Sequence, residues 1–326
     1  MLVDFSVAIP TYNGAKRLPD VLDSLRSQTH LEQLSWEIIV VDNQSSDNTA
    51  AIVEAYQSGW PSESPLHYIF EGERGAAFAR QRAIETAKGS YVGFLDDDNI
   101  PEPDWVRASY DFAQNHPQVG AFGSAISGEF LAPPPEELTS LHPYLGLINR
   151  GRKAHRYKPQ NRVLPPTAGL VVRREAWLKA VPPRLFLNHT DKDAGLSCED
   201  LEAVLYIQKA GWEIWYNPAS KIRHKIAPNR WQKDYLLSVM RCNGLSRHHL
   251  RMLRLPAWQQ PGATVAYWMK DFLQLGHHLY RYGRLPKTEI VEACNRQLLK
   301  SMLLSPFFLG KIRWENWKRS FTMNNE

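Results

Sequence analysis

The sequence of 326 residues is poor in cysteine and has no long apolar run. No stretch approaches the roughly 18 to 20 uncharged apolar residues that a helix needs to span a bilayer, because Lys300 and Lys311 flank even the apolar run between them. The three cysteines are widely spaced and fit neither a disulfide framework nor a zinc site, so we expect reduced thiols. The first residues lack the basic start and apolar segment of a secretory signal. We therefore expect a cytoplasmic protein.

The glycine-rich loops that many enzymes use to bind phosphate are also missing. The chain contains neither G-x-G-x-x-G after the first predicted strand nor G-x-x-x-x-G-K-[ST] at any position. This absence disfavours dinucleotide-dependent dehydrogenases and P-loop nucleoside triphosphatases.

Charge is distributed unevenly along the chain. Residues 1–220 carry a formal charge of −8 and residues 221–326 carry +13, although the whole chain has a net charge of only +5. A basic tail suits nucleic acid, an anionic membrane surface or a phosphorylated substrate. Nucleic-acid binding would need basic residues interleaved with aromatic ones on one platform, and the acidic crevice described below argues against it. We expect no nucleic-acid partner.

The first half of the chain alternates short β-branched runs with helical patterns. This alternation predicts an α/β fold with a mostly parallel sheet that is flanked by helices. The run at residues 38–41 (IIVV) is apolar on both faces, as a buried central strand requires. The predicted strands cover residues 6–10, 37–41, 66–70 and 91–95, and the predicted helices cover residues 16–28, 47–57 and 75–87.

Beyond residue 104 the pattern loosens. The stretch at residues 132–163 is irregular and rich in arginine and lysine, and a loop of this length is typical of a functional element. We predict a domain over residues 1–226, followed by a basic, amphipathic helical extension over residues 227–326. The other predicted elements are strands at residues 119–126, 164–172 and 213–216 and a helix at residues 200–210.

Polar residues directly follow three of the predicted strands. Ligands of an open parallel sheet lie outside the carboxyl ends of its strands, so these residues are candidates for one shared crevice. Any one of the three segments alone is more often a turn or a helix cap than a binding site. The segments are residues 10–14 (PTYNG), 42–47 (DNQSSD) and 96–99 (DDDN).

Three successive carboxylates, Asp96, Asp97 and Asp98, follow the last of these strands and are called the aspartate turn below. They repel one another, so a positive partner is expected. A divalent cation, Mg²⁺ or Mn²⁺, is the simplest partner, because carboxylate oxygens suit these hard ions, which keep positions open for substrate phosphates. A diphosphate would then be the ligand. Arg74 and Arg80 flank and enter the helix at residues 75–87, where guanidinium groups and a helix N-terminus can both face a phosphate.

A second acidic pair, Glu199 and Asp200, begins a predicted helix. Such a pair is ordinarily only a helix cap. A transfer to a hydroxyl needs a general base, however, and Asp200 is our candidate, with Glu199 orienting it or binding an acceptor hydroxyl. His224 could ligate the cation through a neutral nitrogen, although a lone histidine is more often structural.

Four segments together resemble the family 2 glycosyltransferases in sequence, order and spacing, over roughly residues 4–226. They are residues 6–13 (SVAIPTYN), 40–47 (VVDNQSSD), 94–98 (FLDDD) and 198–200 (CED). The resemblance implies a GT-A fold, a nucleotide-sugar donor, Mg²⁺ or Mn²⁺, and inversion at the anomeric carbon by one direct displacement.

The resemblance also implies a role for each candidate residue. Asp98 would be the direct metal ligand and His224 would close the metal site. Asp200 would be the base in the Glu-Asp motif, and Gly169 would lie on the acceptor side. The implied donor-binding residues are Pro10, Thr11, Tyr12, Asn13, Asp42, Arg74, Arg80, Asp96 and Asp97.

Processive members of this family carry Gln-x-x-Arg-Trp and several membrane helices. Here Ala227 stands at the Gln position before Arg230 and Trp231, and no apolar run is long enough to span a membrane. We therefore predict a non-processive enzyme that transfers one sugar, from a UDP-sugar in preference to GDP- or dTDP-sugars, to a saccharide or lipid-linked acceptor in bacterial surface or extracellular polysaccharide synthesis. The basic tail then suits peripheral contact with the inner face of the membrane, or equally a helical cap over the acceptor site.

Two alternatives stay open. A sugar-1-phosphate nucleotidyltransferase would need a glycine-rich basic loop after the first strand, which residues 10–13 do not supply. A non-catalytic nucleotide-sugar-binding module is disfavoured by the presence of both the aspartate turn and the Glu-Asp pair.

Overall fold

The computed structural model describes residues 3–161, 163–188, 196–283 and 289–323, and its contacts divide them into two compact units. The second unit contains residues 134–144, residues 196–198 and the described residues from 228 onward, and the first unit contains the rest. The two short segments were not predicted to belong with the C-terminal helices. The three cysteines are free thiols, as predicted.

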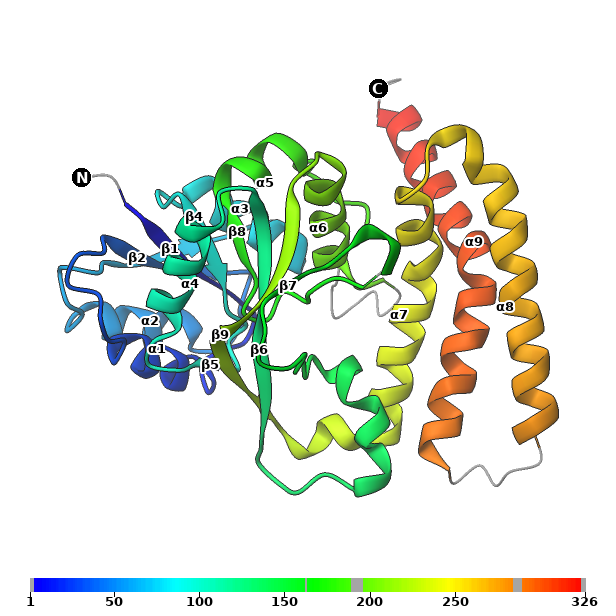
Figure 1. The fold of residues 1–326 in the computed structure, drawn as a ribbon, viewed down its shortest axis with the longest axis horizontal. Coiled ribbons are helices and arrows are strands. Elements are labelled where there is room, and N and C mark those ends of the chain that lie inside the picture. The colour runs from blue at the N-terminus through cyan, green and yellow to red at the C-terminus, as the bar shows by residue number, and fades with distance from the viewer. Residues whose placement is uncertain (1–2, 162, 189–195, 284–288, 324–326) are drawn as a thin grey trace. The chain divides into compact units, whose positions relative to one another are not determined.

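A nine-stranded sheet forms the centre of the first unit (Figure 1). Its strands within the described residues are β1 (Phe5–Thr11), β2 (Trp36–Asp42), β3 (Leu66–Phe70), β4 (Tyr91–Phe94), β5 (Asn99–Pro101), β6 (Val119–Phe130), β7 (His155–Arg156), β8 (Val171–Arg173) and β9 (Glu213–Ile226). The order is β3-β2-β1-β4-β8-β6-β9-β5, with β7 paired to β9. Pairing is parallel from β3 to β4 and between β6 and β9, and antiparallel elsewhere. The predicted α/β class is confirmed, and its parallel part lies mainly in the N-terminal half.

Side chains that alternate across the strands build a hydrophobic core on each face of this sheet. In β1, Val7 and Ile9 belong to one core and Ala8 to the other. Every residue of β2 is buried, as the apolar run predicts for a central strand. The helices of this unit are α1 (Leu18–Arg26), α2 (Thr49–Gln57), α3 (Ala76–Thr86), α4 (Trp105–Asn115), α5 (Arg174–Ala180) and α6 (Glu199–Lys209).

Two strands differ most in length from the prediction, and β6 is four residues longer than predicted. The strand predicted at residues 164–172 shrinks to β8, because Pro165 and Pro166 have no N–H for a ladder and Gly169 takes a φ of +63°. The strand predicted at residues 213–216 continues through Pro218 as the long β9, with a break in its register against β6. This continuation places His224 opposite Asn99 of β5.

Three long helices, α7 (Lys233–Leu253), α8 (Gln260–Tyr282) and α9 (Ile290–Met323), form most of the second unit, as the sequence predicts. Helix α9 packs against both α7 and α8 (Figure 1). Gly244 lets α7 approach α9 closely, since an added Cβ would lie 2.5 Å from the Cβ of Ser301. Among the described residues, every helix is too short or too polar to cross a membrane. The 3₁₀ helices are η1 (Glu136–Leu145), η2 (Pro159–Asn161), η3 (Pro228–Trp231) and η4 (Ala257–Gln259).

A buried ion pair joins α7 to α8. The Arg251 guanidinium donates to both carboxylate oxygens of Asp271 at 2.5 and 2.9 Å, and Asp271 is only 1% exposed. The guanidinium also lies over the Tyr267 ring, 4.6 Å from its centroid. Either charge buried without the other would destabilise the fold. The pair therefore favours the one alignment of α7 and α8 that brings Arg251 and Asp271 together.

We expect Asp271→Ala to lower the free energy of unfolding by about 3 kcal/mol, because it leaves the Arg251 guanidinium buried without its counter-ion. Denaturant unfolding followed by circular dichroism measures this loss. The double variant Arg251→Met/Asp271→Leu removes both charges and should lose much less. An equal loss in the two variants would show that packing, and not the ion pair, sets the cost.

Candidate active site

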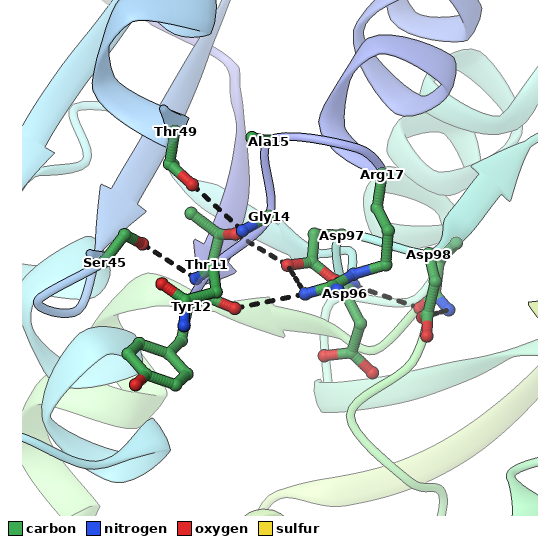
Figure 2. Close-up of polar contacts among 12 residues, drawn as sticks. Thr11, Tyr12, Gly14, Ala15, Arg17, Ser45, Thr49, Asp96, Asp97 and Asp98 are labelled. Carbon is green, nitrogen blue, oxygen red and sulfur yellow. Dashed lines mark hydrogen bonds and ion pairs between the residues drawn. The ribbon is translucent and has the colours of Figure 1, made fainter. Parts of the chain in front are cut away.

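Asp97 ties the loop after β1 to the aspartate turn (Figure 2). Its Oδ1 accepts from Nε of Arg17 at 2.7 Å, and its Oδ2 accepts from Nη2 of Arg17 at 2.8 Å and from Oγ1 of Thr11 at 2.6 Å. A glycine is needed at position 14 beside these hydrogen bonds, because an added Cβ would lie 2.1 Å from Oγ1 of Thr11. Asp97 therefore has a structural task, and its predicted approach to ribose and cation stays a prediction. The sequence did not reveal Arg17, since an arginine before a helix carries no signal of a partner 80 residues away.

Asp42, at the end of β2, is held by two hydrogen bonds. The Tyr68 hydroxyl donates to its Oδ2 at 2.8 Å, and the backbone N–H of Ser45 donates to its Oδ1 at 2.8 Å. Desolvation and the bond to Asp42 raise the pKa of Tyr68 to about 12. The contact between Asp42 and a nucleotide base stays a prediction.

The remaining predicted donor residues of the first loop lie close to this position. Pro10 lies within β1, and the N–H of Asn13 donates to Oγ of Ser45 at 2.9 Å, which joins the loops after β1 and β2 (Figure 2). The Arg74 guanidinium lies over the Tyr12 ring, 4.3 Å from its centroid. Tyr12 and Arg74, far apart in sequence, are thus brought together.

Two asparagines bind the N-terminus of α3: Asn43, from the candidate segment at residues 42–47, and Asn188, which the sequence analysis did not identify. The N–H of Gly75 donates to Oδ1 of Asn43 at 2.6 Å, and the N–H of Ala77 donates to Oδ1 of Asn188 at 3.1 Å. Asn188 also fills the space beside Gly75, where an added Cβ would lie 2.0 Å from its Nδ2. These amides are already satisfied by the protein, so the helix N-terminus is a weaker diphosphate site than the sequence suggested.

Arg80, a buried residue of α3, connects the two acidic sites. Its Nη1 donates to Oε1 of Glu199 at 2.5 Å, and its Nη2 lies 3.5 Å from Oδ1 of Asp96. Burial alone would lower the pKa of Arg80, but the carboxylates around it more than offset this and raise it. Arg82 lies on another face of α3 and pairs with Glu71 at 3.0 Å. Arg80 is therefore a link within the site, and its predicted contact with base or diphosphate stays a prediction.

Asp96 is a partly desolvated carboxyl group with two carboxylates beside it. Its pKa is raised to about 6, first by partial loss of hydration and then by the neighbouring carboxylates Asp98 and Asp97, against the opposing effects of Arg80 and His224. Water still reaches 39% of its side chain, so the carboxylate remains available to a ligand. The raised pKa agrees with the expectation that the aspartate turn attracts a cation.

Asp98 faces His224, because β5 pairs with β9 just beyond it. Its Oδ1 lies 3.4 Å from Nε2 of His224 and accepts from Nδ2 of Asn99 at 3.1 Å. Two ligands at right angles on one ion, with bonds of about 2.1 Å, lie about 3 Å apart, so this spacing suits a shared cation. Within the described residues no three His, Cys, Asp or Glu side chains gather closely enough to hold a metal alone. A cation here would need further oxygens, and substrate phosphates can supply them.

Asp200 is held in place at the start of α6. Its Oδ2 accepts from the N–H of Thr167 at 3.0 Å and its Oδ1 from the N–H of Leu201 at 2.7 Å. Burial first, and then the adjacent Glu199 carboxylate, raise the pKa of Asp200. The hydrogen bond from Thr167 also fixes the segment of Gly169, whose carbonyl accepts from Oγ of Ser124 at 2.6 Å. The predicted base and the predicted acceptor segment therefore lie side by side.

The family described as "Glycosyl transferase family 2" matches residues 6–176, which are more than half of the chain. This match includes the aspartate turn and ends before Asp200 and His224. The roles of those two residues therefore depend on the geometry given above.

Several known proteins are similar to the chain. TuaG of Bacillus subtilis is 35% identical over 108 residues, which are 33% of this chain and 40% of TuaG. A glucosyl-dolichyl phosphate glucuronosyltransferase of Haloferax volcanii is 23% identical over 254 residues, which are 76% of this chain and 77% of that protein. The crystal structure of Staphylococcus aureus TarS 1-349 in complex with UDP-GlcNAc has a TM-score of 0.51 at 17% identity and covers 93% of this chain and 91% of that one. The fold is thus the GT-A fold that the resemblance implied.

The similarity to TuaG spans less than half of the length of TuaG. The family match over residues 6–176 places the chain in its family, whereas donor, acceptor and site roles must be argued from the residues themselves.

We expect the Asp96 carboxyl to titrate near pH 6 in metal-free protein, because lost hydration and like charges favour its neutral form. Carboxyl ¹³C NMR measures the midpoint. Asp98→Asn should lower the midpoint by removing a like charge, and Arg80→Gln should raise it by removing a cation. Asp104→Asn, an exposed control, should leave it unchanged. A midpoint near 4 in the unmodified protein, or shifts of the same sign in both site variants, would contradict this account.

Proposed function

We propose a sugar-transfer reaction for this chain, which belongs to glycosyl transferase family 2. The enzyme moves one sugar from a nucleotide-diphospho-sugar to a hydroxyl of a saccharide or lipid-linked acceptor, with inversion at the anomeric carbon. The observation that carries the proposal is the bridge that Arg80 forms between Asp96 and Glu199. It holds the donor-side carboxylates and the Glu199-Asp200 pair at the two ends of one buried guanidinium.

Asp200 is the proposed general base. Two backbone N–H groups orient its carboxylate and leave lone pairs to accept a proton. Asp200 takes the proton of the acceptor hydroxyl while that oxygen attacks the anomeric carbon. The bond from this carbon to the diphosphate breaks, and its electron pair leaves with the diphosphate. The raised pKa of Asp200 supports this role, because a base is most effective when its pKa lies near the working pH.

Asp98 and His224 are the proposed ligands of Mn²⁺ or Mg²⁺, with Asp96 beside them. When bound, such an ion would offset the negative charge that develops on the leaving diphosphate. The 3.4 Å separation of Asp98 and His224 and the raised pKa of Asp96 support the site. Because the protein supplies few ligands by itself, cation and diphosphate should bind together.

The relatives support a particular kind of donor and acceptor. TarS is named as a poly(ribitol-phosphate) β-N-acetylglucosaminyltransferase and was crystallised with UDP-GlcNAc. The Haloferax enzyme is named for transfer to a glucosyl-dolichyl phosphate. We therefore propose a UDP-sugar as donor and a surface-polysaccharide intermediate as acceptor, with one sugar added per encounter.

Two variants should separate the proposed roles. Asp200→Asn should keep its affinity for UDP-sugar and Mn²⁺ but lose transfer by roughly 10²- to 10⁴-fold, because only proton removal is affected. Asp98→Ala should lose Mn²⁺-dependent donor binding. Calorimetry measures binding, and donor hydrolysis with water in place of the acceptor, screened over UDP-, GDP- and dTDP-sugars with Mn²⁺ or chelator, measures turnover.

Asp111→Asn, a surface change on α4, is the matched control and should leave both properties intact. Equal loss of donor binding in the two site variants would refute the division of roles. If the unmodified protein bound no nucleotide-sugar, the enzyme proposal would fail. Formation of nucleotide-sugar and pyrophosphate from a nucleoside triphosphate would favour a nucleotidyltransferase instead.

We also propose that the second unit contacts the inner face of the membrane from the cytoplasm. Leu304, Phe307 and Trp314 of α9 are 58%, 65% and 54% exposed, and their spacing with Lys300 and Lys311 places all five on one helix face. Large apolar side chains between lysines suit an anionic lipid surface. A second copy of the chain would bring lysines against lysines, so a membrane is the better partner.

We expect Phe307→Ser/Trp314→Ser to weaken binding to phosphatidylglycerol vesicles roughly tenfold, because two aromatic side chains no longer enter the lipid interface. Vesicle flotation measures this binding. Leu131→Ser/Leu178→Ser removes two exposed apolar side chains of the first unit and should have no effect. Equal binding to phosphatidylcholine vesicles, or dimers in place of vesicle binding, would contradict the proposal.

A further inference from the structure

A cavity of about 580 Å³ opens in the first unit beside the break in the register of β9. On its outer edge β9 pairs with β7 up to Tyr216 and with β5 from Ile222, and the described residues provide no strand partner between them. The cavity lies at this interruption. It is lined by the apolar side chains Ile126, Ile148 and Ile222 and by the polar residues Asn149, Arg152 and Lys221.

The cavity has a surplus of positive charge. Arg152 and Lys221 are exposed, and within the described residues neither side chain makes an ion pair or a side-chain hydrogen bond. The acid among the lining residues, Glu102, is already paired with Arg223 at 3.0 Å.

Two other arginines of the predicted functional loop at residues 132–163 have structural partners. Arg150 lies over the Tyr157 ring, and Arg156 pairs with Glu213 at 2.6 Å. Arg152 differs from them because it lines the cavity and pairs with no acid in the part of the chain that the structure describes.

The cavity shares strand β9 with the proposed metal site. Lys221 and His224 both belong to β9 and are separated by about 10 Å along the strand. Gly146 lies against His224, and two residues later Ile148 bridges to Ile126 beside the cavity. The loop at residues 146–152 thus runs from the surroundings of His224 to the cavity, which Ile148 lines.

We propose that this cavity binds an acid group, phosphate or carboxylate, of an anionic saccharide acceptor, away from the sugar hydroxyl that receives the new residue. The proposal rests on the proposed function and names its acceptor class. The forked guanidinium of Arg152 matches both acid groups, Lys221 adds a second cation, and the isoleucines provide an apolar surface for the carbon skeleton.

The test compares three probes of equal length by calorimetry: a ribitol-phosphate oligomer, an oligogalacturonate and a neutral maltooligosaccharide. We expect the chain to prefer an acidic probe, and Arg152→Gln/Lys221→Gln to bind that probe roughly tenfold more weakly, since two ion pairs are lost. Lys88→Gln/Lys209→Gln has the same net charge and removes two exposed lysines outside the cavity, so it should bind as the unmodified protein does.

Each outcome decides the proposal. Binding of the phosphate probe alone, or of the carboxylate probe alone, supports the site and identifies its acid. The proposal would be overturned if the chain bound neither acidic probe, or if it bound the neutral probe as tightly as the acidic ones. Equal losses of affinity for the acidic probe in the two double variants would also overturn it. Donor hydrolysis is measured in parallel and should be unchanged in Arg152→Gln/Lys221→Gln. If hydrolysis is absent while acid binding follows the prediction, the sugar-transfer proposal fails and the anion site stands.

Discussion

The arrangement of the site depends on one buried guanidinium. Arg80 contacts Glu199 and Asp96, which lie far apart in the sequence. Carboxylates gathered this closely would otherwise repel one another or take up protons. Without Arg80, Glu199 would be a buried, uncompensated charge, and the relative position of Asp96 and Asp200 would no longer be fixed. Burial raises the pKa of Asp96 most, and the neighbouring carboxylates Asp98 and Asp97 add to this against the opposing effects of Arg80 and His224.

The sheet imposes the second constraint, because it decides which residues meet the aspartate turn. Strand β9 would end near Pro218 if it were regular, and the break in its register lets it continue to Ile226. The continuation pairs with β5 and sets His224 against Asp98. The same irregularity interrupts the edge of β9 and leaves the cavity with Arg152 and Lys221. One departure from regular pairing thus accounts for both the proposed metal ligand and the proposed acceptor site.

The parts that could be predicted from sequence are those fixed by local pattern. The apolar run of β2, the helices that follow each early strand, and the acidic motifs at strand and helix ends all lie where periodicity and turn chemistry place them. The missed features involve partners distant in sequence. Arg17 holds Asp97 across 80 residues, and Asn188 caps α3 across 111. Nothing in the neighbourhood of either residue signals such a partner, because tertiary packing selects it. The extension of β9 was missed for a related reason, since a proline marks a strand end unless a bulge accommodates it.

The charges of the first unit suggest how donor and acceptor are kept apart. A diphosphate is repelled by the aspartate turn unless a cation accompanies it, so the donor should enter together with its ion. The aspartate turn would also repel the acid groups of an acidic acceptor. A second metal ion is not needed to offset this repulsion if those acid groups bind away from the turn. Lys221 lies about 10 Å along β9 from His224, and Arg152 lines the same cavity as Lys221. Both side chains carry positive charge, which the aspartate turn lacks. Under the proposed roles each anion would have its own cation, and the neutral hydroxyl would be the part of the acceptor that approaches the proposed base Asp200 without an electrostatic penalty.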